Sequence, residues 1–195
     1  GTEIHLFKSS QPEVPTLEEF LAEEVKEGET VGFDGRVISA AEGKKLRTVL
    51  EEKKINISSS RDIVEEAWIQ RPPMEKTHAW FLRTEEAGES QSDKLRRIRK
   101  KMEELGADAH FVTSLDDIAW IYNMRGQDIA CSPVIQAYTM ITLNQAILFV
   151  QDGVLNKEQK EELEKEKIYV KDYKEIIRFT ENLPACVLLL DPDKV

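Results

Sequence analysis

AHFVTSLDDIAWIYNMRGQDIACSPVI is the sequence of residues 109–135, a segment in which apolar side chains, aromatic rings and helix-boundary residues coincide. Ala109–Thr113 favours a buried strand, because small, aromatic and β-branched residues fit a pleated, half-buried surface. A helix is expected directly after it, with Ser114 as the N-cap and Asp117 reaching back to the N–H of the cap. Gly126 is expected to end this helix in the left-handed conformation. A strand, a capped turn and a short helix would then bring several polar residues to one rim.

Four residues at this rim are our candidates for function: Trp120, Asn123, Arg125 and Asp128. Trp120 is either a core side chain or a partly exposed wall for a ligand or a neighbouring subunit, since its ring buries well and its N–H can serve a polar partner. Arg125 is either a helix-end cation, paired locally with Asp128, or a preorganised guanidinium that faces an interface or a substrate channel. Asn123 is most simply a residue of the turn that ends the helix. We expect these four residues to contribute to substrate access or to a subunit interface.

The composition limits the class of protein. With 195 residues, of which 41% are hydrophobic, the chain can bury one generous core or two small ones. The net charge of −10 argues against a nucleic-acid partner, and no apolar run approaches the roughly 20 residues of a membrane span. Cys131 and Cys186 are isolated thiols, which fits a reducing compartment better than a disulfide framework. We therefore expect a soluble cytoplasmic protein with no nucleic-acid partner and no membrane partner.

Helices alternate with short strands in the first part of the sequence. The expected elements are a strand at Ile4–Phe7, a helix capped by Thr16 and Glu19 and closed by Gly28, a strand at Thr30–Phe33, a helix at Ala40–Lys53, a strand at Ile55–Ile57 and a helix at Arg61–Gln70. Trp68 and the apolar residues before it are spaced as a buried face of that last helix. Arg71-Pro72-Pro73 ends it, since proline lacks an N–H. Residues 1–73 would therefore form a first α/β domain.

A second α/β domain is expected at residues 91–195, after a connector without clear periodicity at residues 74–90. Its elements are a helix at Ser92–Leu105 ended by Gly106, the strand and helix described above, paired strands at Tyr138–Leu143 and Ala146–Val150, a helix at Lys157–Lys167, a strand at Ile168–Val170, a helix from Tyr173 to Thr180 and a strand at Cys186–Leu190. Such alternation predicts the α/β fold class, with mixed sheets flanked by helices in both domains.

Groups that could perform chemistry are scarce in this sequence. His110, Asp116 and Asp117 lie close together, but one histidine and two carboxylates, of which Asp117 serves the helix cap, make a poor metal site. Ser114 begins a helix and lacks the context of a nucleophile elbow or an oxyanion hole, so a catalytic triad is not supported. Cys131 is a candidate reactive thiol or, more simply, a small buried side chain. We assign no catalytic residue and no metal ligand to this chain.

The most basic segment of the sequence lies in the helix expected at Ser92–Leu105, where the cations run from Lys94 to Lys101. Leu95, Ile98, Met102 and Leu105 already form the apolar face of this helix. We therefore expect the cations to form a solvated face, and docking onto an acidic partner is the alternative.

The central segment resembles a known family. Residues 112–120 (VTSLDDIAW), residues 123–126 (NMRG), Asp128, Ser132-Pro133-Val134 and Ala137-Tyr138 are similar to the second domain of the long, three-domain aminopeptidase P proteins, the Xaa-Pro aminopeptidases of the creatinase/prolidase superfamily. Pro15-Thr16, Gly32-Phe33-Asp34 and Trp68 followed by Arg71-Pro72 resemble the later part of the first domain of that family.

The resemblance implies two domains of the creatinase N-terminal fold, the first incomplete, in the non-catalytic N-terminal region of an enzyme that removes the residue preceding proline. In that family a later pita-bread domain binds a pair of divalent metals, usually manganese, through two aspartates, one histidine and two glutamates. This sequence ends at Val195, before any such ligands. The implied partners are the catalytic domain of the same polypeptide, a second copy in a homodimer, and short peptide substrates. One alternative is a stand-alone binding or dimerisation module without activity, and another is a part in creatine or dipeptide hydrolysis.

Overall fold

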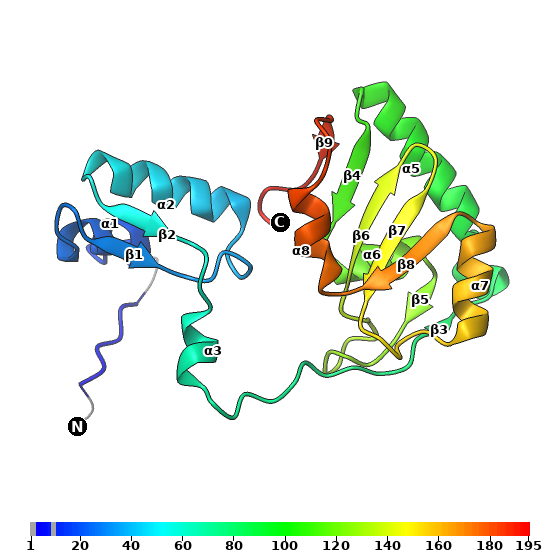
Figure 1. Cartoon of the computed structure of the whole chain (residues 1–195), viewed down its shortest axis with the longest axis horizontal. Helices are drawn as coiled ribbons and strands as arrows, with labels where there is room; N and C mark the ends of the chain where they lie inside the picture. The colour runs from blue at the N-terminus through cyan, green and yellow to red at the C-terminus, as the bar shows by residue number, and fades with distance from the viewer. Residues whose placement is uncertain (1–2, 9–10) are drawn as a thin grey trace. The chain divides into compact units, whose positions relative to one another are not determined.

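The computed structural model describes residues 3–8 and 11–195, and the chain divides into two compact units with the boundary between Pro72 and Pro73 (Figure 1). The first unit contains α1 (Leu17–Glu24), β1 (Thr30–Gly32), α2 (Ala40–Glu52), β2 (Asn56–Ser58) and α3 (Ile63–Ala67). The second unit contains β3 (Trp80–Phe81), α4 (Thr84–Ala87), α5 (Gln91–Leu105), β4 (Ala109–Val112), α6 (Leu115–Ile121), β5 (Met124–Arg125), β6 (Ala137–Thr142), β7 (Ala146–Val150), α7 (Lys157–Lys165), β8 (Ile168–Asp172), α8 (Glu175–Glu181) and β9 (Leu188–Leu189). No helix in the described part of the chain has the length and apolarity needed to cross a membrane.

The first unit packs α1 and α2 against a two-stranded parallel sheet. β1 and β2 pair with Thr30 opposite Asn56, and α2 lies between them in the chain. Leu46, Leu50 and Ile55 form the buried core of this unit. The predicted alternation of helix and strand is therefore confirmed from α1 to β2.

The helices of this unit begin with side-chain caps, and α3 is capped by the Asp62 carboxylate, which accepts a hydrogen bond from the N–H of Glu65. Thr16 and Glu19 form the predicted capping box, in which the N–H of Thr16 donates to the Glu19 carboxylate at 2.8 Å. α2 begins with the same arrangement of Ser39 and Glu42. The end of α1 differs from the prediction, because the helix stops at Glu24 and Gly28 takes its left-handed conformation (φ 86°) in the turn that follows.

Two further predictions for the first unit are wrong. Ile4–Phe7 forms no strand, and its side chains are exposed, because no neighbouring strand of the described residues pairs with it. The helix predicted at Arg61–Gln70 is confined to Ile63–Ala67, and its apolar side chains are largely exposed, with Trp68 at 51%. A helix of five residues is too short to cover a core with one continuous face.

A five-stranded mixed sheet forms the centre of the second unit, in the order β8-β7-β6-β4-β9. β4 pairs antiparallel with β6, and β6 pairs antiparallel with β7, which confirms the two strands predicted around the Asn144-Gln145 turn. β8 and β9 add to the two edges in parallel. The turn is stabilised by Thr142, whose hydroxyl oxygen accepts hydrogen bonds from both turn N–H groups.

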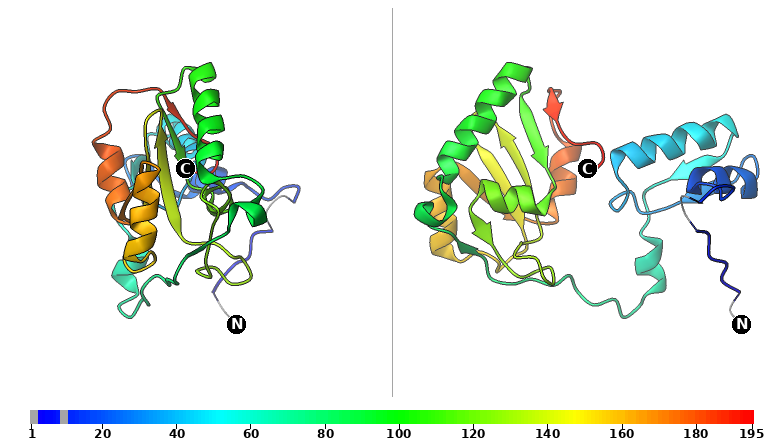
Figure 2. Two further views of the ribbon diagram at one scale, coloured as in Figure 1. Left: turned by 90° about the vertical axis from the view of Figure 1, so that its right-hand side faces the viewer. Right: turned by 180° about the vertical axis from the view of Figure 1, so that it is seen from behind.

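Helices cover both faces of this sheet. Leu95 of α5, Ile118 of α6 and Leu163 of α7 belong to one buried cluster that includes Leu148 of β7. On the opposite face Phe149 meets α8, and Figure 2 shows α5 and α8 on opposite sides of the sheet. β7 is buried at all of its positions, which explains why its sequence, AILFV, is an uninterrupted apolar run.

Residues 74–90, predicted to be a connector, are part of the second unit. They contain β3, which pairs antiparallel with β5 and places Trp80 opposite Arg125, and the single turn α4. Phe81 packs against the main buried cluster. The sequence shows no period here because a two-residue strand and a one-turn helix are too short to repeat.

α5 confirms its predicted end and corrects its predicted surface. Gly106 ends the helix in the left-handed conformation (φ 67°). Leu105, expected on the apolar face, is exposed, whereas Lys94, expected on the solvated face, is buried with 2% of its surface exposed. Lys94 lies four residues before Ile98, on the side of the helix that faces the core.

α6 begins where predicted, but its two ends differ from the prediction. Ser114 occupies the N-cap position without a side-chain hydrogen bond to the helix. The helix ends at Ile121, and the left-handed residue after it is Asn123 (φ 51°) rather than Gly126. Gly126 is needed for a different reason, because a Cβ atom there would lie 1.9 Å from Cδ1 of the buried Ile135.

This contact predicts that Gly126→Ala destabilises the second unit by roughly 1–3 kcal/mol, since overpacking a filled core forces side chains or backbone to move. Urea unfolding followed by circular dichroism measures the change. Ile135→Val removes the Cδ1 atom that the new methyl would meet, so the double variant should lose less stability than the two single variants added together. Strictly additive losses would contradict the proposed clash.

Candidate functional site

The carboxyl end of α6 is bound by side chains from other parts of the second unit. The carbonyl oxygen of Trp120 accepts a hydrogen bond from Lys94 Nζ at 2.8 Å, and that of Tyr122 accepts from Gln91 Nε2 at 2.6 Å. Arg125 Nη1 donates to the carbonyl oxygen of Ala119 at 2.8 Å. The last carbonyls of a helix have no partner within the helix and form its negative end, so two cations and an amide are favourable there.

Trp120 lies at this helix end with 45% of its surface exposed. Lys94 Nζ is 4.5 Å from the centre of the indole ring, and the guanidinium carbon of Arg97 is 5.6 Å from it. Both distances are within the range of cation–π attraction. Arg97 also donates two hydrogen bonds to the Glu89 carboxylate, at 2.9 and 2.7 Å, and this carboxylate raises the pKa of the guanidinium. The indole therefore rests against one buried and one exposed cation.

Asn123 is buried and joins three segments of the second unit. Its Oδ1 accepts a hydrogen bond from Lys94 Nζ, and its Nδ2 donates to the carbonyl oxygen of Glu89 at 2.9 Å. Its own carbonyl oxygen accepts from the N–H of Leu82 at 2.8 Å. The left-handed backbone of Asn123 permits this arrangement, and asparagine tolerates that conformation better than most residues.

Asp128 is buried with 7% of its surface exposed and bonds to segments before and after it in the chain. Its Oδ1 accepts hydrogen bonds from the N–H and the hydroxyl of Thr77, both at 2.7 Å, and its Oδ2 accepts from the N–H of Gln136 at 2.9 Å. Among the described residues Asp128 forms no ion pair with Arg125. The carboxylate thus fixes residues 74–90 onto the second unit.

The structure brings together three of the four sequence-predicted rim residues. Trp120 and Arg125 are partly exposed at the end of α6, and Asn123 lies buried beneath them, while Asp128 belongs to a separate cluster of hydrogen bonds. Sequence reasoning missed Lys94, although its position four residues before Ile98 and eight before Met102 on one helix face was a usable signal.

Other candidates from the sequence do not assemble into a site within the described residues. No group of three or more histidine, cysteine, aspartate or glutamate side chains is placed to bind a metal ion. His110 lies beside β9, where its Nδ1 is 3.0 Å from the carbonyl oxygen of Leu189. Cys131, expected to be buried, is exposed, as is Cys186. Cys131 is exposed because it lies in the loop between β5 and β6, outside the sheet.

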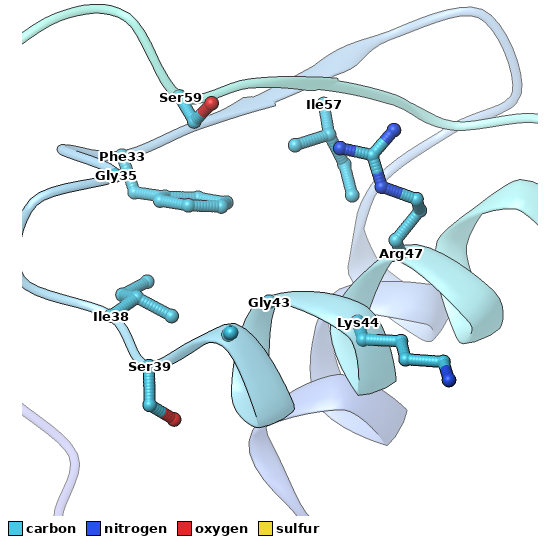
Figure 3. A pocket seen from close by; sticks show the side chains of 10 residues that line it. Phe33, Gly35, Ile38, Ser39, Gly43, Lys44, Arg47, Ile57 and Ser59 are labelled. Carbon is cyan, nitrogen blue, oxygen red and sulfur yellow. The ribbon is translucent and has the colours of Figure 1, made fainter. Parts of the chain in front are cut away.

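The first unit has a cavity of about 330 Å³ beside the N-terminal end of α2 (Figure 3). Its lining combines apolar side chains with two cations and includes Phe33, Ile38, Ile57, Lys44 and Arg47. The capping box of Ser39 and Glu42 already satisfies N–H groups at this helix end. The cavity therefore does not require an anionic ligand to complete the helix terminus.

Residues 70–195 match the family model described as the Creatinase/Prolidase N-terminal domain. The chain belongs to this family. The match confirms the resemblance seen in the sequence and covers the whole of α6 and the rim. The creatinase/prolidase N-terminal domain is thus the fold that positions Trp120, Asn123 and Arg125.

Several relatives of this chain are named as aminopeptidases. A protein named probable Xaa-Pro aminopeptidase P from Sordaria macrospora is 35% identical over 184 residues, which are 92% of this chain and 30% of the relative. Aminopeptidase P1 of Lotus japonicus is 32% identical over 162 residues, which are 83% of this chain and 25% of the relative. The chain therefore spans less than a third of the length of these relatives.

A solved structure extends the likeness to the fold. The crystal structure of X-prolyl aminopeptidase from Caenorhabditis elegans, described as a cytosolic enzyme with a di-nuclear active site, matches with a TM-score of 0.86 and 26% sequence identity. The match covers 91% of this chain and 29% of that one. The predicted α/β fold with helices on mixed sheets is therefore confirmed.

In this creatinase/prolidase N-terminal domain, Asp128→Asn should destabilise folding by about 1–3 kcal/mol. Both carboxylate oxygens accept hydrogen bonds from Thr77 or Gln136, so the new NH₂ group would face an N–H or O–H donor in a buried site. Chemical denaturation of the two proteins measures the loss. Asp116→Asn is the matched control, since Asp116 is exposed and should change stability by less than about 0.5 kcal/mol. Equal stability of the Asp128 and Asp116 variants would show that the buried carboxylate does not fix residues 74–90.

Proposed function

We propose that this chain is the non-catalytic N-terminal region of a dinuclear-metal Xaa-Pro aminopeptidase, an enzyme that removes the N-terminal residue preceding proline. The observation that supports this proposal most strongly is the match of 91% of the chain to 29% of an X-prolyl aminopeptidase described with a di-nuclear active site. The names of the curated relatives agree with it. Homology to part of an enzyme supports the parent activity, while chemistry has to be argued from side chains.

The metal chemistry belongs, in this proposal, to a catalytic domain of the same polypeptide outside the present sequence. We propose two divalent ions there, with manganese as the metal. The described side chains of this chain do not fit such a centre, because no three potential ligands converge. Bound to its own domain, the metal pair would supply the activated water.

For the rim we propose a role in substrate access and in a homodimer contact. Trp120 and Arg125 are the partly exposed members, and Asn123 and Asp128 are buried beneath or beside them in hydrogen bonds. A rigid wall beside a reaction centre can exclude folded chains and orient a short peptide without supplying the nucleophile. The hydrogen bonds to the end of α6 provide that rigidity.

We propose that the protein is cytoplasmic. The C. elegans relative is described as a cytosolic enzyme, and Cys131 and Cys186 are unpaired and exposed, as is typical of proteins in a reducing compartment.

A second function, a binding or dimerisation module without enzymatic activity, is favoured by one observation. The side chains that the structure brings together at the rim satisfy one another, and they include no activated nucleophile or metal ligand set. The gene decides between the two, because only the aminopeptidase requires the metal ligands in the sequence that follows Val195.

If the metal chemistry lies in a separate catalytic domain, the purified 195-residue protein should not hydrolyse Xaa-Pro peptides with added Mn²⁺. The described part of the chain holds no group of side chains that could bind the metal and activate water. Release of the N-terminal amino acid from a tripeptide with proline second measures the activity. The longer protein from the same gene, assayed with the same metal, is the control. Turnover by the 195-residue protein that survives repurification would place the chemistry in this chain and contradict the proposal.

The rim proposal predicts that Trp120→Ala and Arg125→Ala, made in the longer protein, reduce kcat/KM for a tripeptide by roughly threefold to tenfold or weaken the dimer. Steady-state kinetics and light scattering measure the two effects. Tyr169→Ala is the control, since this side chain is 39% exposed on β8, away from the rim. If both rim variants keep the kcat/KM and the molecular mass in solution of the wild type, these residues are only structural.

A further inference from the structure

We propose that Lys94 is the positioning residue for Trp120, whose indole it fixes in one orientation at the end of α6. The inference rests on the proposed function only for its kinetic consequence, since the positioning itself concerns the folded chain. Nothing in the similarity to aminopeptidases assigns a role to this side chain.

Lys94 is a buried cation without a carboxylate partner among the described residues. Only 2% of its surface is exposed, and no ion pair includes it. A buried charge is costly unless hydrogen bonds replace the water it loses. The side chain therefore has a specific set of partners rather than a place on a solvated helix face.

All of those partners lie within one turn of chain at the end of α6. The ammonium donates to the carbonyl oxygen of Trp120 at 2.8 Å and to Oδ1 of Asn123. Its third N–H can face the indole of Trp120, whose ring centre is 4.5 Å from Nζ. One cation thus contacts both the backbone and the ring of the same residue.

Contact with both parts of Trp120 restricts the rotation between them. A backbone bond alone would leave the side-chain torsions free, and a ring contact alone would leave the helix end free to fray. Arg97, one turn along α5, adds a second cation 5.6 Å from the ring centre and is itself bound to Glu89. Two cations of α5, Lys94 and Arg97, therefore hold the partly exposed indole.

The surroundings of Lys94 favour strong interactions of its ammonium. Burial lowers the pKa of the group, the Glu89 carboxylate opposes that shift, and Arg125 and Arg97 add to it. In a site that excludes water, hydrogen bonds from a charged donor and cation–π contacts are stronger than at the surface. Removal of the charge should consequently release the ring.

The test uses the 195-residue protein labelled with 5-fluorotryptophan. The protein has three tryptophans: Trp68, Trp80 and Trp120. In the ¹⁹F spectrum the Trp120 resonance, assigned with Trp120→Phe, should shift and broaden in Lys94→Met, which keeps the apolar stem and removes the ammonium. Trp68 lies in the first unit and should not change. Lys101→Met is the matched control on the same helix, because Lys101 is exposed and, among the described residues, pairs only with Glu104.

Lys94→Gln is measured in parallel, because it retains amide donors and should fold even if Lys94→Met does not. A Trp120 resonance unchanged from the wild type in either folded variant would overturn the proposal. A shift of the Trp120 line alone, absent from Lys101→Met, is the result expected.

Enzyme kinetics of the variants distinguish a failure of this inference from a failure of the proposed function. In the longer protein, Lys94→Met should reduce kcat/KM for a tripeptide about threefold to tenfold, as is expected of Trp120→Ala, and the double variant should be no worse than Trp120→Ala alone. Additive effects would show that Lys94 acts independently of Trp120 and would overturn the inference while leaving the rim intact. If Trp120→Ala has no effect, the rim proposal fails, and the ¹⁹F spectrum still decides the positioning.

Discussion

A helix that ends inside a packed unit leaves its last carbonyl groups without the i+4 partners of a continuing helix, and at the end of α6 two cations and an amide donate hydrogen bonds to such groups. Lys94 and Arg125 donate to carbonyl oxygens of the last turn, and Gln91 donates to the residue after it. The donors come from α5 and β5, so the end of a seven-residue helix becomes the meeting point of three elements. The orientation of Trp120 and Arg125 depends on this arrangement.

The buried carboxylate of Asp128 has a comparable effect on the neighbouring segment. Residues 74–90 have little secondary structure, and three hydrogen bonds from Thr77 and Gln136 fix one end of them beside the sheet. β3 can then pair with β5, which places Trp80 opposite Arg125. Both sides of the rim therefore rest on buried polar groups whose partners are fully specified, and such groups favour one arrangement over its alternatives.

Local sequence signals predicted the elements more reliably than the contacts between them. The apolar run of β7, the spacing of Leu95, Ile98 and Met102 in α5 and the left-handed Gly106 all depend on neighbours within a few residues, and the structure confirms them. Asn123 and Gly126 exchanged their expected roles, because the need for glycine at position 126 arises from Ile135, nine residues away. Short-range patterns cannot contain such a contact.

The cations of α5 show the same limit of prediction from short-range patterns. A run of cations on a helix predicts a solvated face, and Arg96 and Lys101 agree with that expectation. Lys94 departs from it because its hydrogen-bond acceptors, the carbonyl oxygen of Trp120 and the Oδ1 of Asn123, lie more than twenty residues further along the chain. The pattern of residues 109–135 identified the rim without its buried support, since Lys94 and Glu89, which bind Asn123, lie outside that segment.

A wall built in this way suits a protein whose chemistry lies in another domain. Lys94, Asn123 and Arg125 donate or accept hydrogen bonds within the same unit, and the described residues bring no set of metal ligands together there. Under the proposed function, the contribution of the rim to peptide binding is its shape: an indole and a guanidinium presented by a turn whose backbone is held by hydrogen bonds. Rigidity matters for such a role because a mobile wall would not discriminate between a short peptide and a folded chain, whereas a fixed one excludes the larger substrate on geometry alone.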